Sequence, residues 1–419
     1  MRIAVLSVHT CPLAPLGGWE TGGMNVYVRE LSRGLGRLGV ETDVFTRRQD
    51  PDVPTIVELG DRARVIHVDA GAPRHRDKYA VVDDLPELAC GIQRYRNFLG
   101  ARYDLIHSHY WLSGRLATLF QEHWHAPVVA MFHTLGALKN RVALDSAELE
   151  QQVRVDIERR TMATADRIVA ATEVDRSHML EAYGANPRKI AVVPGGVNLD
   201  VFGPGSRADA RRRLGLRPLP TLLFVGRIQR LKGIDILIQA AAKLRDDLGP
   251  LQVLIVGGTG DDSGQRTSEE ARELARLRGQ VADLGLGDTV QFVGAVEQAQ
   301  LAEYYRAADV TVMPSTYESF GLVAVESLAC GTPVVASRVG GLATIIRDGE
   351  NGALIPWRDP ELFADRIRAI LTDARHAADL QRGAVETAQQ YSWHGVAERT
   401  VQVYDSLLAV PAGRLGSAE

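Results

Sequence analysis

The sequence predicts an α/β protein made of two doubly wound, parallel-sheet domains that face each other across a cleft. Short apolar runs alternate with segments of helical period, as in sheets that are covered by helices on both faces. The alternation stops at a stretch rich in Gly and Pro near the middle of the chain and then starts again. At 419 residues the chain is also too long for a single hydrophobic core. Ligands of such sheets bind at the carboxyl ends of the strands, so functional residues are expected there.

The first half of the chain contains the expected elements of one domain. Continuous apolar runs predict buried strands at 3–8, 104–109, 127–132, 167–172 and 190–194. Apolar residues at helical spacing predict helices at 24–39, 112–124 and 146–165. These helices would connect parallel strands.

The second half repeats the pattern. Strands are predicted at 221–226, 251–258, 290–294, 309–314 and 333–337, with helices between them. The stretch 194–213 is rich in Gly and Pro and is therefore interpreted as a linker. A final amphipathic segment, Trp393 to Leu408, predicts a helix, but its pattern does not indicate the domain on which it packs.

Composition excludes several classes of protein. A net charge of −4 and a pI near 6.3 are unlike those of a nucleic-acid binder. The three cysteines, Cys11, Cys90 and Cys330, lie far apart and fit neither a disulfide framework nor a metal cluster, which favours a cytoplasmic protein. No apolar run approaches the ~18 residues that cross a bilayer, so no membrane span is expected. Small-molecule substrates are the expected partners, and a homodimer remains open.

Polar residues follow several predicted strands of the first domain. His9, His109 and His133 each lie at a strand end, and together they indicate a polar pocket rather than three unrelated structural histidines. Their spacing is not that of metal ligands on one helix, so no metal is expected. Gly22 and Gly23 precede a predicted helix, where backbone N–H groups attract phosphate. The dinucleotide and P-loop fingerprints are both absent.

Two carboxylates stand out in the second domain because their surroundings are otherwise small and apolar. Glu318 and Glu326 flank the start of a short predicted helix, Gly321–Cys330, whose first N–H groups suit phosphate oxygens. The distance that they span along a helix, about 12 Å, is close to the length of a sugar nucleotide from ribose to hexose. No neighbouring cation in the sequence pairs with them. Arg227 and Lys232 follow the first strand of this domain and suggest a clamp on a pyrophosphate.

These motifs together resemble those of the retaining glycosyltransferases of family 4. The matching stretches are "ESFGLVAVE" (318–326), "GRIQRLKG" (226–233) and "GGMNVYVREL" (22–31), and the resemblance covers nearly the whole chain. It implies that Glu318 holds hydroxyls of the donor sugar and that Glu326 holds the ribose of UDP. It also implies that Arg227, Lys232 and the Gly23 amide neutralise the diphosphate. The remaining donor-binding residues that it implies are Val296, Phe320, Gly321 and Leu322.

The resemblance also implies the domain layout. Such enzymes have the GT-B fold, with two Rossmann-like domains and a C-terminal helix that crosses back to the first domain. The expected acceptor-binding domain is therefore 1–197 completed by 393–419, and the nucleotide-sugar-binding domain is 198–392.

Within the family, the chain resembles the N-acetylglucosaminyltransferases of mycothiol synthesis, which glycosylate inositol phosphate. "YDLIHSHYWLSG" (103–114) and "HTLGALKN" (133–140) carry this likeness. The resemblance implies that the acceptor's phosphate is bound by Lys78, Tyr110, Thr134 and Arg154, with His9 and Asn25 near its polyol. Helical periodicity alone places Lys78 and Arg154 on the surface.

One departure keeps a second acceptor open. Those enzymes carry Ala where this chain has Gly136, and "HTLG" is also similar to the "HSLG" of sucrose-phosphate synthases, which use fructose 6-phosphate. The expected donor is accordingly UDP-N-acetylglucosamine or UDP-glucose. The UDP-sugar is a co-substrate; no cofactor is expected to be required, and Mg²⁺ is not indicated.

The expected mechanism is transfer without a covalent intermediate. No carboxylate nucleophile follows a strand of the first domain, and the resemblance implies that the leaving diphosphate helps to deprotonate the acceptor hydroxyl. His133, Glu318, Arg227 and Lys232 are the candidate catalytic residues. Two other classes remain open: a non-catalytic nucleotide-sugar binder on the same fold, and a phosphatidylinositol mannosyltransferase working at a membrane surface.

Overall fold

The computed structural model describes residues 1–15, 21–258, 268–356 and 358–409. The chain divides into two compact units. The N-terminal unit contains Met1–Leu13, Met24–Pro194 and the C-terminal segment from Trp393; the C-terminal unit contains Gly195–Ser392 and the short segment from Ala14 to Gly23. The main boundary thus falls between Pro194 and Gly195, at the start of the predicted Gly- and Pro-rich stretch.

The sheet of the N-terminal unit has the order β3-β4-β2-β1-β5-β6-β7-β8. Its neighbours pair in parallel except for β3, which runs antiparallel to β4 at one edge. The strands are β1 (Arg2–Leu6), β2 (Glu41–Arg47), β3 (Ile56–Gly60), β4 (Ala63–Val68), β5 (Leu105–His109), β6 (Val128–Met131), β7 (Arg167–Ala170) and β8 (Ile190–Val192). The five predicted strands of this unit are present.

Strands β2, β3 and β4 were not predicted, and the reason lies in their polar residues. Asp43 is buried in the middle of β2, where it accepts hydrogen bonds from Arg2, Arg64 and the hydroxyl of Tyr103. Such an ion-pair network satisfies a buried carboxylate but interrupts the apolar run from which a strand is predicted.

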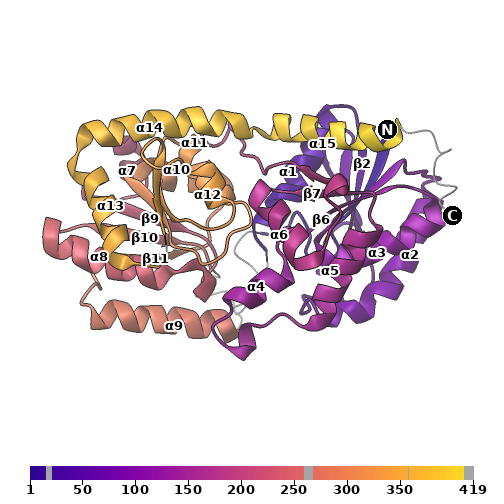
Figure 1. Ribbon diagram of the computed structural model, residues 1–419, viewed down its shortest axis with the longest axis horizontal. Helices are drawn as coiled ribbons and strands as arrows, with labels where there is room; N and C mark the ends of the chain where they lie inside the picture. The colour runs from indigo at the N-terminus through magenta and orange to yellow at the C-terminus, as the bar shows by residue number, and fades with distance from the viewer. Residues whose placement is uncertain (16–20, 259–267, 357, 410–419) are drawn as a thin grey trace. The chain divides into compact units, whose positions relative to one another are not determined.

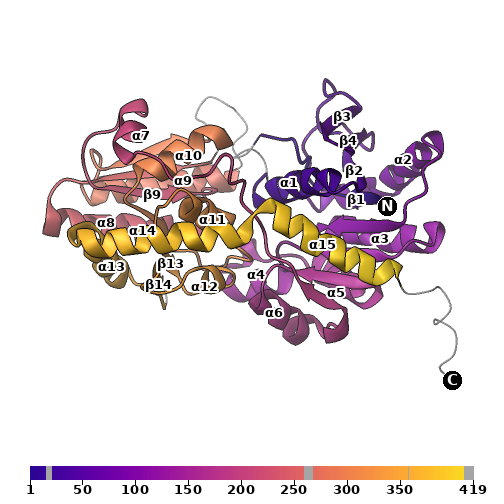
Figure 2. The same cartoon turned by 90° about the horizontal axis from the view of Figure 1, so that it is seen from above.

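The helices of the N-terminal unit cover both faces of this sheet (Figures 1 and 2). They are α1 (Gly23–Arg37), η1 (Ala80–Asp84), α2 (Leu85–Phe98), α3 (Tyr110–Trp124), α4 (Gly136–Val142), η2 (Ser146–Glu148), α5 (Gln152–Thr164), α6 (Glu173–Tyr183), η3 (Pro187–Lys189) and α15 (Trp393–Leu408). Helix α15 packs on α1, since a Cβ at Gly34 would lie 2.9 Å from the Cβ of Ala397. The C-terminal helix therefore belongs to the N-terminal unit.

The prediction of a single helix at 146–165 is wrong in one respect, because the helix is interrupted between η2 and α5. The backbone of Glu150 is held there by a side chain: Asn140 accepts from its N–H at 2.6 Å and donates to its carbonyl at 3.1 Å. An amide that pairs both backbone groups replaces the helical bonds at this residue. The break positions Glu150 beside α4.

The sheet of the C-terminal unit has the order β11-β10-β9-β12-β13-β14, and every pair is parallel. The strands are β9 (Thr221–Val225), β10 (Gln252–Val256), β11 (Val290–Gly294), β12 (Val310–Met313), β13 (Val334–Ser337) and β14 (Gly352–Ile355). The helices are α7 (Arg207–Arg213), η4 (Arg230–Lys232), α8 (Ile234–Leu248), α9 (Ser268–Asp283), α10 (Gln298–Ala307), α11 (Leu322–Ala329), α12 (Leu342–Ile345), α13 (Pro360–Thr372), α14 (Ala374–Ala388) and η5 (Gln389–Tyr391). Strand β14 was not predicted, and helix α7 occupies the last part of the predicted linker.

The core of the C-terminal unit follows the pleat of its strands. Leu222, Phe224, Val253 and Ile255 face one side, where they join apolar residues of α8, α9 and α13 in a continuous buried cluster. Figure 1 shows α8 and α9 on that face and α10, α11 and α14 on the other. Among the described residues, no helix is both long enough and apolar enough to cross a membrane.

Each sheet has a point at which the direction of winding reverses. In the N-terminal unit β1 pairs with β2 on one side and with β5 on the other; in the C-terminal unit β9 lies between β10 and β12. Loops that leave neighbouring strands there diverge to opposite faces and leave a crevice, which is where ligands of such sheets bind. The predicted site residues follow these strands.

Candidate active site

In the C-terminal unit, the loop after β9 leads to Lys232, which pairs with one of the two predicted carboxylates. The ammonium of Lys232 lies 2.6 Å from Oε2 of Glu318, and both side chains are only about one-fifth exposed, at 22% and 18%. Gly233 makes this approach possible: it has φ of 68°, and a Cβ there would lie 2.0 Å from the carbonyl oxygen of Pro314. The prediction that no nearby cation pairs with Glu318 considered only sequence neighbours; the fold brings one from 86 positions upstream.

The loop that carries Glu318 is fixed by a glycine pair that the sequence analysis missed. Gly341 donates from its N–H to the carbonyl of Glu318 at 3.0 Å. A Cβ at Gly340 would lie 1.8 Å from that same carbonyl oxygen, and one at Gly341 would lie 2.1 Å from the carbonyl oxygen of Phe320. Only glycine permits this close approach, so "VGG" (339–341) was the signal in the sequence.

Helix α11 begins immediately after this loop. Its first residue, Leu322, follows Gly321, which has φ of 106° and adopts a conformation that is costly for other residues. Phe320 and Gly321 are buried and Leu322 is partly buried, so their backbone groups lie at the helix N-terminus as predicted. One turn on, the buried carboxylate of Glu326 accepts a hydrogen bond from the Tyr305 hydroxyl at 2.9 Å.

The other predicted donor-binding residues lie in loops and at the start of α1. Arg227 is partly buried in the loop after β9, and Val296 is partly buried in the loop between β11 and α10. A Cβ at Gly22 would lie 3.9 Å from Nε of Arg227, and one at Gly23 would lie 3.3 Å from a methyl group of Leu322. Part of the predicted glycine loop, residues 16–20, lies outside the described residues.

In the N-terminal unit, residues from three strand ends meet around Tyr110. The Tyr110 ring stacks on His9, with ring centroids 5.1 Å apart, and the guanidinium of Arg154 lies 5.0 Å from its centroid. Tyr110 starts α3 with φ of 77°, in the left-handed region where a bulky side chain is strained. Nearby, Asn25 is buried: it donates to the carbonyl of Cys11 at 2.6 Å and accepts from the Thr10 hydroxyl at 3.3 Å.

Arg154 is fully buried, so the surface position that helical periodicity predicts for it is wrong. Its guanidinium donates to the Tyr110 hydroxyl at 3.1 Å and to both the carbonyl and the hydroxyl of Thr134, at 2.9 and 3.0 Å. Its Nε donates to Glu158 at 2.8 Å, and that carboxylate is equally buried. The structure therefore brings together three of the four predicted phosphate-binding residues.

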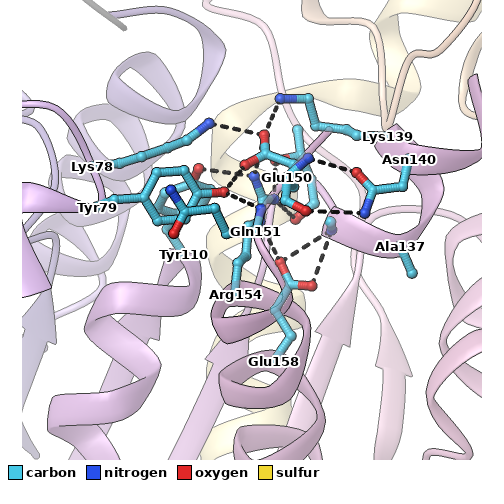
Figure 3. A network of polar contacts seen from close by, with 12 residues as sticks. Lys78, Tyr79, Tyr110, Ala137, Lys139, Asn140, Glu150, Gln151, Arg154 and Glu158 are labelled. Atoms are coloured by element: carbon cyan, nitrogen blue, oxygen red, sulfur yellow. Dashed lines mark hydrogen bonds and ion pairs between the residues drawn. The ribbon is translucent and has the colours of Figure 1, made fainter. Parts of the chain in front are cut away.

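The fourth, Lys78, reaches Arg154 through a carboxylate that was not predicted (Figure 3). Oε1 of Glu150 lies 2.9 Å from the ammonium of Lys78 and 2.9 Å from Nη1 of Arg154, and it also pairs with the ammonium of Lys139. The Tyr79 hydroxyl donates to the other oxygen of Glu150 at 2.5 Å. The Glu150 side chain is 2% exposed, so three cations converge on one buried oxygen.

Three cations, Lys78, Lys139 and Arg154, meet two carboxylates, Glu150 and Glu158, in this cluster. Burial opposes the charged form of Glu150, but Arg154, Lys139 and Lys78 outweigh it and hold the pKa of that carboxyl far below its ordinary value. The pKa of Lys139 is nevertheless lowered, because burial and repulsion from Lys78 exceed the attraction of Glu150. Two carboxylates do not neutralise three cations, and a further anion would stabilise the cluster.

The predicted histidines form a buried row at the same end of the sheet. Nδ1 of His109 lies 2.9 Å from Nε2 of His133, so one ring donates to the other. His107, which was not predicted, lies beside them with its ring centroid 4.2 Å from that of His109, and its Nδ1 shares a hydrogen bond with the hydroxyl of Tyr404 at 2.7 Å. Tyr404 of α15 therefore extends the hydrogen-bonded contacts of the histidine row.

Burial determines the charge of this row. It lowers the pKa of His107 to about 3; burial and repulsion from His107 lower the pKa of His133 to about 3 as well. Burial and the two neighbouring rings hold the pKa of His109 well below its usual range. All three are neutral at physiological pH, so His133 can hydrogen-bond but carries no charge.

Several residues of this site escaped prediction: Tyr79, His107, Lys139, Glu150 and Glu158. One signal was present, since Glu150, Arg154 and Glu158 are spaced by four and such residues share one face of a helix. The ion pairs of Arg154 with Glu150 and Glu158 use this spacing, although Glu150 itself precedes α5. Within the described part of the chain, no group of three or more His, Cys, Asp or Glu side chains could hold a metal ion.

Comparison with family models matches both units. Residues 21–201 match the model described as Glycosyltransferase Family 4, and residues 206–387 match the model described as Glycosyl transferases group 1. The two matches meet close to the boundary between the units.

Individual relatives cover almost the whole chain. D-inositol 3-phosphate glycosyltransferase 2 of Catenulispora acidiphila is 43% identical over 96% of this chain and 94% of its own length. D-inositol 3-phosphate glycosyltransferase of Geodermatophilus obscurus is 45% identical over 97% of this chain and 88% of its own length.

Among solved structures, sucrose-phosphate synthase from Thermosynechococcus elongatus has a TM-score of 0.89 and 35% identity, and the match covers 97% of this chain and 99% of that one. HepE of Anabaena, solved in complex with UDP and glucose, has a TM-score of 0.75 at 20% identity, over 98% of this chain and 100% of that one. The predicted GT-B fold, with two Rossmann-like α/β domains, is confirmed.

Proposed function

This chain belongs to glycosyltransferase family 4, and on that premise we propose that it moves a sugar from a UDP-sugar to a hydroxyl of D-inositol 3-phosphate, with retention at the anomeric carbon. Curated relatives that carry this acceptor in their names support the choice. UDP-N-acetylglucosamine is the first donor to test and UDP-glucose the second.

The main observation in favour of a phosphorylated acceptor is the buried cluster of Lys78, Lys139 and Arg154. A phosphate monoester brings two negative charges and several lone pairs, and the two carboxylates of this cluster leave one of its three positive charges unbalanced. Arg154 would supply a planar fork and the lysines point charges, while the hydroxyls of Tyr110 and Thr134 would complete the shell without adding charge. An uncharged inositol would leave the excess of positive charge unrelieved.

The donor would bind at the carboxyl ends of β9 and β12. Arg227 and Lys232 would neutralise the diphosphate, together with the N–H groups at the start of α11 and the Gly23 amide. Glu318 would accept hydroxyls of the hexose, and Glu326, already held by a tyrosine hydroxyl, would accept those of the ribose.

The chemical step would then rest on positioning and on stabilisation of the leaving group. Transfer requires the acceptor's hydroxyl and the anomeric carbon of the donor sugar to be held in a reactive orientation. As the sugar–oxygen bond breaks, negative charge develops on the β-phosphate, where Lys232 and Arg227 are the available cations. The same phosphate would accept the acceptor's proton, and the neutral His133 would hydrogen-bond to the reacting sugar.

The test is transfer from UDP-N-acetylglucosamine to D-inositol 3-phosphate against unphosphorylated inositol. We expect the phosphate to raise kcat/KM at least ~10- to 100-fold, because a charged hydrogen bond contributes about 1.5–3 kcal/mol. Equal rates on the two acceptors would contradict the proposal. The anomeric configuration of the product, determined by NMR coupling constants, tests retention.

A second acceptor is supported by two observations. The structural match with sucrose-phosphate synthase is close at 35% identity, and Gly136 lies directly against Arg154: a Cβ there would be 3.2 Å from its Cδ and Nε. Fructose 6-phosphate presents the same dianion on a different sugar. Faster transfer from UDP-glucose to fructose 6-phosphate than to D-inositol 3-phosphate would make this the better assignment.

A further inference from the structure

Glu150 occupies the position that an acceptor's phosphate would need. Its Oε1 accepts hydrogen bonds from Lys78, at 2.9 Å, and from Lys139, and it forms an ion pair with Nη1 of Arg154 at 2.9 Å (Figure 3). Two of these three cations are the ones that the proposed acceptor site assigns to the phosphate. A phosphate oxygen that approaches them therefore meets donors that are already engaged by an anion.

The backbone and the side chain of Glu150 are held in different ways. Asn140 pairs with the backbone N–H and carbonyl of Glu150, at 2.6 and 3.1 Å, which fixes the chain at this point. The carboxylate is held by the three cations and by the hydroxyl of Tyr79. A change of side-chain rotamer would therefore release the cations without disturbing α4 or α5.

The second carboxylate of the cluster, Glu158, is held quite differently. It accepts from the backbone N–H of Gly136 at 3.0 Å and from the hydroxyl of Tyr183, in addition to Nε of Arg154. Arg154 thus keeps its bonds to Glu158 and Thr134 even when Nη1 exchanges Glu150 for another anion. Glu158 positions the guanidinium, and Glu150 is the second carboxylate that pairs with it, at Nη1.

We propose that Glu150 is an internal substitute for the acceptor's phosphate: it holds Lys78, Lys139 and Arg154 in place while the site is empty and yields these donors when a phosphorylated acceptor binds. The inference rests on the proposed phosphate-bearing acceptor and adds a residue that selects for it. A phosphate dianion can displace the single carboxylate of Glu150 from the three cations, whereas a neutral hydroxyl cannot. Glu150 would therefore exclude acceptors that lack a dianionic group.

The charges of the cluster support an exchange. Lys78, Lys139 and Arg154 contribute three positive charges, and Glu150 and Glu158 contribute two negative ones. A phosphate dianion that entered with Glu150 still in place would meet a buried like charge at the point of binding, which is unfavourable at low dielectric. Once Glu150 withdraws, three cations face the dianion and Glu158, and the charges balance.

The experiment is calorimetric titration with inorganic phosphate and with D-inositol 3-phosphate, in the wild type and in Glu150→Gln. The amide removes the competing charge but keeps the size of the side chain, so we expect Glu150→Gln to bind inorganic phosphate about tenfold more tightly. Asp156→Asn is the matched control: it makes the same change of charge on α5, but Asp156 is exposed and pairs with Arg159. Its affinity for phosphate should equal that of the wild type.

A second pair of variants keeps the test decisive if Glu150→Gln does not fold with three uncompensated cations. Lys139→Gln with Glu150→Gln removes one cation and the carboxylate together, which preserves the net charge. This double variant should bind phosphate about tenfold more tightly than Lys139→Gln alone. Equal or weaker binding in both comparisons would mean that Glu150 merely supports the cations, and the inference would be wrong.

The proposed acceptor and the role of Glu150 fail in different ways. If the wild type transfers sugar to D-inositol 3-phosphate but removal of Glu150 tightens no phosphate binding, only the substitute role is wrong. If neither the wild type nor Glu150→Gln binds phosphate, the phosphate site and the inference fall together.

Discussion

The proposed donor site and the proposed acceptor site contain ion pairs of very different construction. In the C-terminal unit, one lysine meets one carboxylate, Lys232 with Glu318, and both remain about one-fifth exposed. In the N-terminal unit, Lys78, Lys139 and Arg154 surround Glu150, and the carboxylate and the guanidinium are essentially inaccessible. The first arrangement is solvated and simple, while the second is buried and carries an excess of positive charge.

The difference suggests a separate basis of specificity for each proposed site. A partly solvated pair such as Lys232–Glu318 contributes little to stability and can change partners at low cost when a diphosphate arrives. Buried charges are costly unless they are paired, so the N-terminal cluster would discriminate by charge: an acceptor without an anionic group would leave the excess positive charge unpaired. Variants that remove one partner from each site should therefore differ in what they lose.

Arg154→Ala should have the largest effect. It leaves the buried Glu150 and Glu158 without their shared partner, and breaking such a pair typically costs about 3–5 kcal/mol of stability. We expect a large loss of kcat/KM on the phosphorylated acceptor, and what transfer remains should no longer prefer it over inositol. Denaturant unfolding and UDP titration separate the two effects: UDP affinity in the folded fraction should stay unchanged, and a parallel loss of UDP binding would contradict the separation of the sites.

The sequence was more informative for the donor site than for the acceptor site, for a physical reason. Glu318, Phe320, Gly321 and Glu326 lie within nine residues of one loop and helix, so a local pattern contained most of that site. The N-terminal cluster is assembled from several loops and helices, and periodicity placed Arg154 on the surface because Tyr110 and Thr134, which cover it, are distant in the sequence. Only the resemblance to a family indicated those residues, and even that missed Glu150.

The same reasoning explains which parts of the fold were predicted. Strands with continuous apolar runs, such as β1 and β10, were found because burial on both faces leaves a clear pattern. Strand β2 was missed because its buried Asp43 is satisfied by arginines from other strands. In β2, as in the cluster around Arg154, a local sequence pattern does not reveal contacts between residues that are far apart in the chain.

Glu318→Gln should have the next largest effect. Unlike Arg154→Ala, it should lower turnover without changing the preference for a phosphorylated acceptor. The amide keeps the shape of the side chain but removes the charge that faces Lys232 and the donor sugar. Because this contact would strengthen as the sugar is transferred, we expect kcat to fall about 100-fold with little change in UDP affinity. Glu326→Gln should instead weaken UDP itself. Steady-state kinetics combined with UDP titration distinguish the two patterns, and an equal loss of UDP binding in Glu318→Gln would identify a structural acid.

His109 tests whether the histidine row positions the proposed catalytic residue. His109→Leu removes the hydrogen bond to His133, and we expect kcat to fall about tenfold with unchanged KM for both substrates. His109→Asn places an amide near the position of Nδ1 and should restore most of the activity. If the leucine and asparagine variants are equally impaired, His109 serves packing and not positioning.

The row should also make stability depend on pH. The pKa of His107 is lowered to about 3 in the folded chain, while an unfolded histidine titrates near its ordinary 6.5. The unfolded state therefore binds more protons between these values, so this contribution is complete above 6.5 and is lost as the pH falls toward 3, by up to about 1.4 kcal/mol per pH unit for each histidine. Urea unfolding from pH 7 to 4 should show a shallower loss in His107→Gln than in the wild type. Identical slopes would mean that His107 does not titrate in this way.

The smallest expected effect concerns Gly136, which touches the buried cluster without carrying charge. Its N–H donates to Glu158, and an added Cβ would lie 3.2 Å from Cδ and Nε of Arg154 and 3.2 Å from Oε2 of Glu158. Gly136 begins α4 at a φ that other residues can adopt, so alanine would gain up to about 1 kcal/mol of helix propensity. Arg154 is held on several sides and cannot move away freely, so this gain should be offset and stability should change by less than about 1 kcal/mol.

Gly136→Ala should therefore act mainly on acceptor choice. A displacement of a few tenths of an ångström in Arg154 would move the bound phosphate and with it the rest of the acceptor. The family resemblance implies Ala at this position in enzymes that use inositol phosphate, so we expect the ratio of kcat/KM for D-inositol 3-phosphate over fructose 6-phosphate to rise about fivefold, which corresponds to ~1 kcal/mol. Gly279→Ala, in the helix α9 of the other unit and with open space around its Cβ, is the control for helix propensity alone. An unchanged ratio in Gly136→Ala would show that the methyl group is accommodated without moving Arg154, and acceptor choice would then lie in the residues around the polyol, His9 and Asn25.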